Sequence, residues 1–169
     1  LQAIAATHGP FAAAIGHSLG AAALGVALRR GVRFERVAFV AAPASISEHA
    51  RNFARWLGIT PAIREAMRRR VERRYGMRFA EIDHIDDLGQ LRLPALFVHD
   101  AGDFEVPFEH GLRLSALMPD ARLIKTHGLG HYRILRDRAV VAAIVDFVSG
   151  NDHDVPSELP ALPRPAPIY

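Results

Sequence analysis

A serine flanked by glycines, between two apolar segments, constrains this chain more than any other feature. The motif GHSLG at 16–20 follows the apolar run 11–15, which is typical of a buried strand, and precedes the alanine-rich run 21–28, which is typical of a packed helix. A Gly-x-Ser-x-Gly motif at a strand-to-helix turn strains the serine backbone and projects its side chain alone. We expect a Cβ at Gly16 or Gly20 to collide with the neighbouring strand or helix.

Strand-like and helix-like segments alternate through most of the chain. Further strands are expected at 36–41, 93–99 and 122–125, and helices at 108–117 and 137–147. Each expected strand is almost continuously apolar, which is typical of a parallel sheet covered by helices on both faces. The predicted fold class is therefore α/β, with a mostly parallel sheet and flanking helices.

Residues 44–90 break this alternation and are interpreted as a helical cap inserted into the sheet domain. Helices are expected at about 47–57 and 60–76, each opening on a serine or threonine N-cap. Residues 51–78 hold nine arginines and two glutamates, a balance of +7, so the rest of the chain carries −4. Basic charge confined to one segment favours a solvated helix face over a nucleic-acid-binding surface. Attraction of an anionic substrate is the alternative.

The 169 residues are enough for one domain with a core, expected to cover residues 1–150. The final segment, 151–169, holds five of the eleven prolines and is expected to be a disordered tail. Cysteine is absent, no apolar run is long enough to cross a bilayer, and the N-terminus lacks a basic-then-apolar leader pattern. These features predict a cytoplasmic location. Because the first residue is Leu1, we also expect the chain to lack its true beginning.

Two later loops supply the partners that a nucleophilic serine needs. A serine hydroxyl reacts when a base removes its proton, and the base needs a carboxylate to orient it. The segment HDAGDFEVP follows the third expected strand, and GLGH follows the fourth. Because the carboxyl ends of parallel strands share one edge of a sheet, these loops are expected to meet the serine. Asp103 competes with Asp100 for the acid, and His131 competes with His127 for the base.

The segments GHSLG, HDAGDFEVP and GLGHYRIL resemble the nucleophile, acid and histidine motifs of the α/β-hydrolase superfamily, in its ester-hydrolase-like members with a helical cap. The resemblance extends from residue 1 to about residue 150. It implies that Ser18 is the nucleophile, Asp103 the acid and His131 the base. It also implies that the backbone amide of Leu19 is one donor of the oxyanion hole.

The reaction implied by this resemblance is the two-step transfer of an acyl group from an ester to water, without a cofactor. The expected partner is a small-molecule acyl substrate, with no nucleic acid and no membrane. Thioesterase, lactonase and cofactor-free haloperoxidase reactions of the same fold stay open as alternatives, as does a non-catalytic binding protein. The apolar acyl pocket is expected at Phe53, Trp56, Leu57 and Met67 of the cap, with Leu19 and Phe104 near the serine.

The chain departs from the superfamily before the motif at 16–20. The superfamily fold has a central sheet of eight strands, and only the last four are visible in this sequence. The preceding part would carry the loop that supplies the second oxyanion-hole amide. Loss of one such donor costs about 2.7–4 kcal/mol of transition-state stabilisation. We therefore expect the chain taken alone to be an inactive C-terminal portion of the fold.

Three further histidines are expected to take no part in the chemistry. His17 is expected to pack under the serine turn, and His99 and His110 to be structural or solvated. With no cysteine and no histidine pair at ligand spacing on one helix, no metal site is expected.

Overall fold

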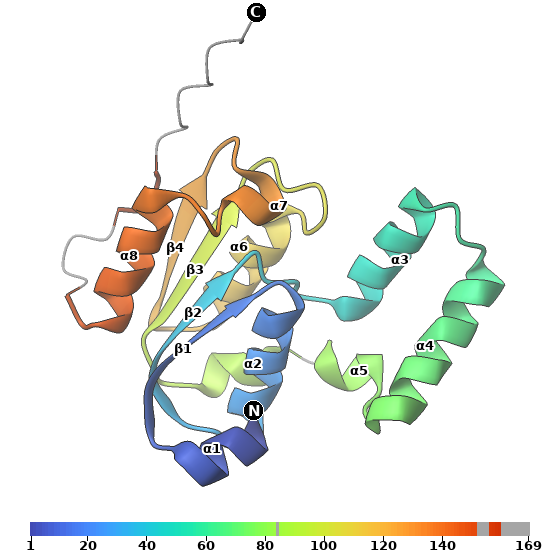
Figure 1. Ribbon diagram of the computed structural model, residues 1–169, viewed down its shortest axis with the longest axis horizontal. Coiled ribbons are helices and arrows are strands. Elements are labelled where there is room, and N and C mark those ends of the chain that lie inside the picture. Colours follow the sequence, from blue (N-terminus) through green and yellow to red (C-terminus); the bar gives the residue numbers. More distant parts are fainter. Residues whose placement is uncertain (84, 152–155, 160–169) are drawn as a thin grey trace, which may run out of the picture.

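Four parallel strands form the sheet of the computed structural model, which describes residues 1–83, 85–151 and 156–159 (Figure 1). In spatial order the strands are β1 (Phe11–His17), β2 (Phe34–Val40), β3 (Ala95–Asp100) and β4 (Ala121–Thr126). Each neighbouring pair runs parallel, so the carboxyl ends of all four strands lie at one edge of the sheet. The predicted α/β class with a parallel sheet is confirmed.

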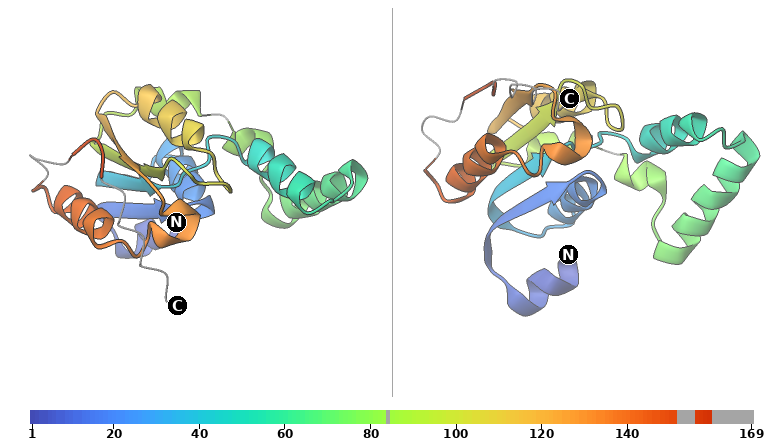
Figure 2. Two further views of the ribbon diagram at one scale, coloured as in Figure 1. Left: turned by 90° about the horizontal axis from the view of Figure 1, so that it is seen from above. Right: turned by 45° about the horizontal axis from the view of Figure 1, so that its top comes forward.

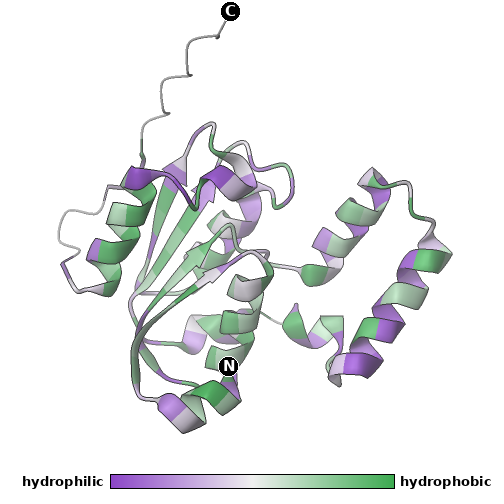
Figure 3. Ribbon diagram, viewed as in Figure 1, coloured by the Kyte–Doolittle hydropathy of each residue, from purple (hydrophilic) through white to green (hydrophobic). Residues whose placement is uncertain are grey.

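Helices cover both faces of the sheet. Successive residues of a strand point to opposite faces, so a strand that is apolar throughout needs a covering layer on each side. Phe39 and Phe97 stack with ring centroids 4.7 Å apart in the core beneath α2 and α6. Val40 lies in the core on the other face, against Phe147 of α8. Figure 3 shows the mainly hydrophobic character of the strands between these layers. The helices of the sheet domain are α1 (Gln2–His8), α2 (Leu19–Arg29), α6 (Phe108–Leu117), α7 (Gly130–Arg133) and α8 (Arg138–Val148).

Further helices lie between β2 and β3, in the segment expected to form a cap. They are α3 (Ile46–Trp56), α4 (Pro61–Tyr75), α5 (Phe79–Ile82) and the 3-10 helix η1 (Asp86–Gln90). The side chains of Ser45 and Thr60 cap α3 and α4, and Gly76 ends α4 with φ of +62°. The sequence predicted Ser47 as the first cap, two residues too late. Figures 1 and 2 show α3 and α4 extending away from the sheet. No helix in the described ranges is long and apolar enough to span a membrane.

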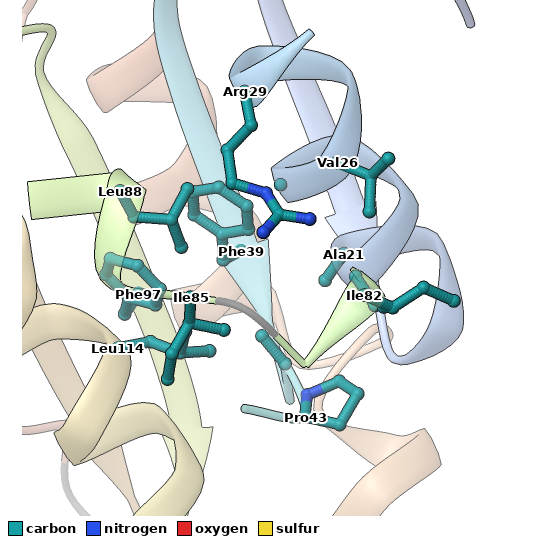
Figure 4. Close-up of a pocket in the computed structure, with 13 residues that line it drawn as sticks. Ala21, Val26, Arg29, Phe39, Pro43, Ile82, Ile85, Leu88, Phe97 and Leu114 are labelled. Atoms are coloured by element: carbon teal, nitrogen blue, oxygen red, sulfur yellow. The ribbon is translucent and has the colours of Figure 1, made fainter. Parts of the chain in front are cut away.

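The segment that leads from the insertion back to β3 packs against α2. Leu88 of η1 is buried in the same core cluster as Leu24 and Phe97. A cavity of about 20 Å³ remains at this seam, and Figure 4 shows Ile82, Ile85 and Leu88 around it, opposite residues of α2. The seam joins the insertion to the core, and none of the predicted catalytic residues lines it.

Part of the expected disordered tail pairs with the outer edge of β4. The Lys125 amide donates to the Ser157 carbonyl, and the Leu159 amide donates to the Lys125 carbonyl, both at 3.0 Å. This pairing is possible because an edge strand offers unpaired backbone groups, and Leu159 packs on the core cluster beneath α8. The rest of the predicted tail at 152–155 and 160–169 lies outside the described residues.

The two glycines of the serine turn differ in how much space surrounds them. A Cβ on Gly16 would lie 2.7 Å from the Ala21 Cα and 2.9 Å from the Ala21 amide nitrogen. A Cβ on Gly20 would meet no atom within 4 Å, so the expected collision there is wrong. The turn bends α2 back over β1, and Gly16 lies inside the bend while Gly20 lies outside it.

Gly16→Ala is expected to lower the midpoint of thermal unfolding, because the backbone of α2 would have to move to admit the methyl group. Overpacking of this kind costs about 1–3 kcal/mol, which corresponds to a fall of several degrees. Gly20→Ala is the matched control, and it should leave the midpoint unchanged or raise it slightly, since alanine favours a helix. Calorimetry of both variants in the full-length protein checks this, and equal losses would contradict it.

Candidate active site

Ser18 lies at the carboxyl end of β1, where the chain turns into α2. Its backbone has φ of +52° and ψ of −121°, a conformation that non-glycine residues rarely adopt. The turn is held because the Ser18 amide donates to the Val40 carbonyl of β2, at 3.0 Å. Leu19 is the first residue of α2, so its amide is one of the N-terminal donors that have no acceptor within a helix.

His131 joins Ser18 to Asp103. The Ser18 hydroxyl lies 2.9 Å from His131 Nε2, and His131 Nδ1 lies 2.7 Å from Asp103 Oδ2. With Nδ1 protonated, His131 donates to the carboxylate and accepts from the serine hydroxyl. His131 follows β4 in the short helix α7, and Asp103 lies in the loop after β3 (Figure 1). The three predicted residues therefore meet beyond the strand ends, as the parallel sheet requires.

The second oxygen of Asp103 is held by its own loop. Oδ1 accepts the amides of Glu105 and Val106, each at 2.9 Å. Burial alone would raise the pKa of Asp103, but the hydrogen bond from His131 and these two amides outweigh it and lower that pKa. Burial would likewise lower the pKa of His131, yet the hydrogen bond and negative charge of Asp103 raise it. Asp103 is thus a fixed carboxylate that favours a charged imidazole beside it.

The structure separates the competing candidates for acid and base. Asp100 is fully buried and accepts the Thr126 hydroxyl at 2.8 Å and the Leu129 amide at 2.9 Å, so it ties the end of β3 to the end of β4 and to the loop after β4. His127 is partly exposed and pairs with Glu158. His131 is therefore the histidine that reaches the serine, and Asp103 is the carboxylate that reaches His131.

Two histidines that were expected to take no part in the chemistry support this arrangement. The Nε2 of His99 donates to the Val106 carbonyl at 2.8 Å, and its ring packs so closely on Gly111 that a Cβ there would lie 2.5 Å from Nδ1. The Nε2 of His17 donates to the carbonyl of His131 at 2.9 Å. Burial lowers the pKa of both histidines, so both stay neutral donors. Nothing in the sequence identifies these partners, because they depend on tertiary contacts.

His110 has a structural contact, as expected: its Nδ1 accepts the amide of Ala44 at 3.0 Å. Within the described residues, no group of three or more histidine, aspartate or glutamate side chains could hold a metal ion.

The predicted acyl pocket is not assembled around Ser18. Phe53 and Met67 line an open cavity of about 400 Å³ between α3, α4 and α5, which includes no residue of the Ser18–His131–Asp103 group. Trp56 is 79% exposed and Phe104 is 98% exposed. Leu57 and Leu19 are also exposed. The side chains were predicted to converge because they are apolar, but α3 and α4 extend away from the sheet (Figure 1), and Phe53 and Met67 line a separate cavity.

No protein-family model matches the chain, and no curated protein sequence matches it. The chain is similar in structure to an alpha/beta hydrolase enzyme from the metagenome of lagoon sediments at Mar Chica, Morocco. The TM-score is 0.64 and the identity 12%, over 89% of this chain and 67% of that one.

Two further solved structures give the same result. The esterase domain of a Rhodothermus marinus protein matches with a TM-score of 0.55 and 20% identity, over 89% of this chain and 61% of that one. A meta-cleavage product hydrolase from Pseudomonas fluorescens matches with a TM-score of 0.57 and 22% identity, over 80% and 64%. The chain thus spans between 61% and 67% of the length of these three structures. Together with the parallel sheet and the serine turn, these likenesses show that the chain has the α/β-hydrolase fold.

Proposed function

We propose that this chain is the catalytic part of a serine hydrolase that cleaves an ester-type acyl substrate through an acyl-enzyme intermediate. The observation that carries the proposal is the line of hydrogen bonds from Ser18 through His131 to Asp103, at 2.9 and 2.7 Å. A serine in an ordinary turn needs neither an imidazole nor a buried carboxylate behind that imidazole. The strained backbone of Ser18 supports the same conclusion, because strain of this kind collects at functional positions.

Each residue has one part in the reaction. Ser18 Oγ attacks the ester carbonyl carbon while His131 Nε2 takes its proton, and that proton then passes to the oxygen of the departing alcohol. In the second step His131 takes a proton from water, whose oxygen attacks the acyl carbon, and returns it to Ser18. Asp103 holds the Nδ1–H and stabilises the imidazolium formed in both steps. The Leu19 amide is proposed to donate to the oxyanion.

Ser18→Ala is expected to abolish hydrolysis of p-nitrophenyl butyrate by the full-length protein, because the attacking oxygen is removed. A fluorophosphonate probe should label the unaltered protein and fail to label the variant. A variant at a serine far from the site, Ser115→Ala, serves as the control and should keep both properties. Labelling that survives Ser18→Ala, or a full-length protein that turns over neither an ester nor a thioester, would contradict the proposal.

Asp103→Asn is expected to lower kcat by up to ~10⁴-fold, as in serine proteases whose histidine is held in the wrong tautomer. Asp100→Asn should reduce kcat much less but lower the midpoint of thermal unfolding, since Asp100 accepts hydrogen bonds from the loop after β3, from the end of β4 and from the loop after β4. Steady-state kinetics and calorimetry on both variants separate the two roles. If kcat falls more in the Asp100 variant, the acid is Asp100.

A separate expectation concerns the second donor of the oxyanion hole. The resemblance to the α/β-hydrolase superfamily implies that a loop before β1 provides the second oxyanion-hole amide. The similar solved structures are longer than this chain. We expect residues 1–169 expressed alone to be oligomeric or insoluble and to lack esterase activity, because β1 is an edge strand with Ile15 57% exposed. Gel filtration and an ester assay check this, and a monomeric, active product would overturn it.

A further inference from the structure

Glu105 is fixed between the acid loop and helix α3 by its backbone. Its amide donates to Asp103 Oδ1 at 2.9 Å, and its carbonyl accepts from His49 Nδ1 at 3.1 Å. Its neighbour Val106 is fully buried and holds His99. The side chain of Glu105 therefore starts from a backbone position that is set by the same contacts as the acid.

The carboxylate of Glu105 lies near the nitrogen of His131 that faces Ser18. Its Oε2 is 4.0 Å from His131 Nε2, the nitrogen that faces Ser18, and it accepts the Tyr132 hydroxyl at 3.0 Å. Asp103, by contrast, faces the opposite nitrogen and is completely buried. The side chain of Glu105 is 40% exposed. Among the described residues, no arginine or lysine forms an ion pair with it, so no such cation offsets its negative charge.

The proton on Nε2 determines which part of a substrate would lie near this charge. During ester cleavage, Nε2 delivers its proton to the oxygen of the departing alcohol, so that oxygen must lie within hydrogen-bonding distance of Nε2. A group 4.0 Å from Nε2 is then close to the first atoms of the alcohol beyond that oxygen. A carboxylate at this place attracts a cation on the alcohol and repels an anion.

Arg64 and Arg68 of α4 border a different cavity from the group around Ser18. Arg68 is paired with Glu65 and Glu72 on its own helix, at 2.6 Å in each case. The cavity beside this helix includes none of the residues around Ser18, so the basic segment does not set the charge next to the nucleophile.

We propose that Glu105 is a specificity-determining residue that selects esters whose alcohol carries a positive charge close to the ester oxygen, such as esters of amino alcohols. This inference rests on the proposed function, because it concerns the leaving group of the same reaction. Tyr132 is the residue that orients the carboxylate.

The test compares two esters of the same shape, choline butyrate and its uncharged analogue 3,3-dimethylbutyl butyrate. Acid release by the full-length protein gives kcat/KM for each, and the ratio of cationic to neutral ester is the readout. The unaltered protein should prefer the cationic ester. In Glu105→Gln the ratio should fall by roughly 5- to 30-fold, the size expected for one unit charge at about 5 Å in a partly solvated site. Glu109→Gln makes the same change in net charge on the neighbouring helix and should leave the ratio unchanged.

A second measurement needs no variant. Raising the ionic strength from about 0.01 M to about 0.5 M should lower the ratio in the unaltered protein, because salt screens an exposed charge. The inference is overturned if the ratio is the same in Glu105→Gln and unaffected by salt while both esters are hydrolysed. If the full-length protein hydrolyses neither these esters nor p-nitrophenyl butyrate, the proposed function itself fails, and the inference fails with it.

Discussion

Parallel pairing of the four strands is the constraint on which the candidate site depends. Ser18, Asp103 and His131 follow β1, β3 and β4, and they can meet because the carboxyl ends of these strands lie at one edge. One antiparallel strand would send its following loop to the opposite edge and separate the group. The packing that keeps the strands parallel, with helices on both faces, therefore also sets the distances between the serine, the imidazole and the carboxylate.

A carboxylate that plays no part in the proposed chemistry secures the ends of β3 and β4. Asp100 is fully buried, and burial would raise its pKa, but the Leu129 amide, the Thr126 hydroxyl and the Gly102 amide together lower it. It therefore stays charged and gathers donors from both loops. A buried charge with fewer donors would be strongly destabilising. The acid motif thus uses its first aspartate to hold the loops in place and its second to orient the histidine.

The sequence was a good guide to features that depend on neighbouring residues. The parallel sheet, the serine turn and the helix at 108–117 follow from apolar runs and turn residues, and the structure has all of them. The meeting of Ser18, Asp103 and His131 was also predictable, since each follows a strand of one parallel sheet. The direction of α3 and α4 was not, because it depends on contacts between distant segments. For the same reason, the hydrogen bonds of His17 and His99 left no pattern in the sequence.

The two edges of the sheet are not equivalent. Residues 157–159 run beside β4 and occupy its backbone groups at Lys125, whereas the outer side of β1 has no strand beside it among the described residues. A further strand can therefore join this sheet along β1, whereas the carboxyl-terminal end of β4 is already paired at Lys125. Since β1 leads directly into the strained turn at Ser18, such a strand would stiffen the support of the nucleophile. Addition of a strand beside β1 and positioning of the Ser18 side chain would then occur together, as one cooperative event.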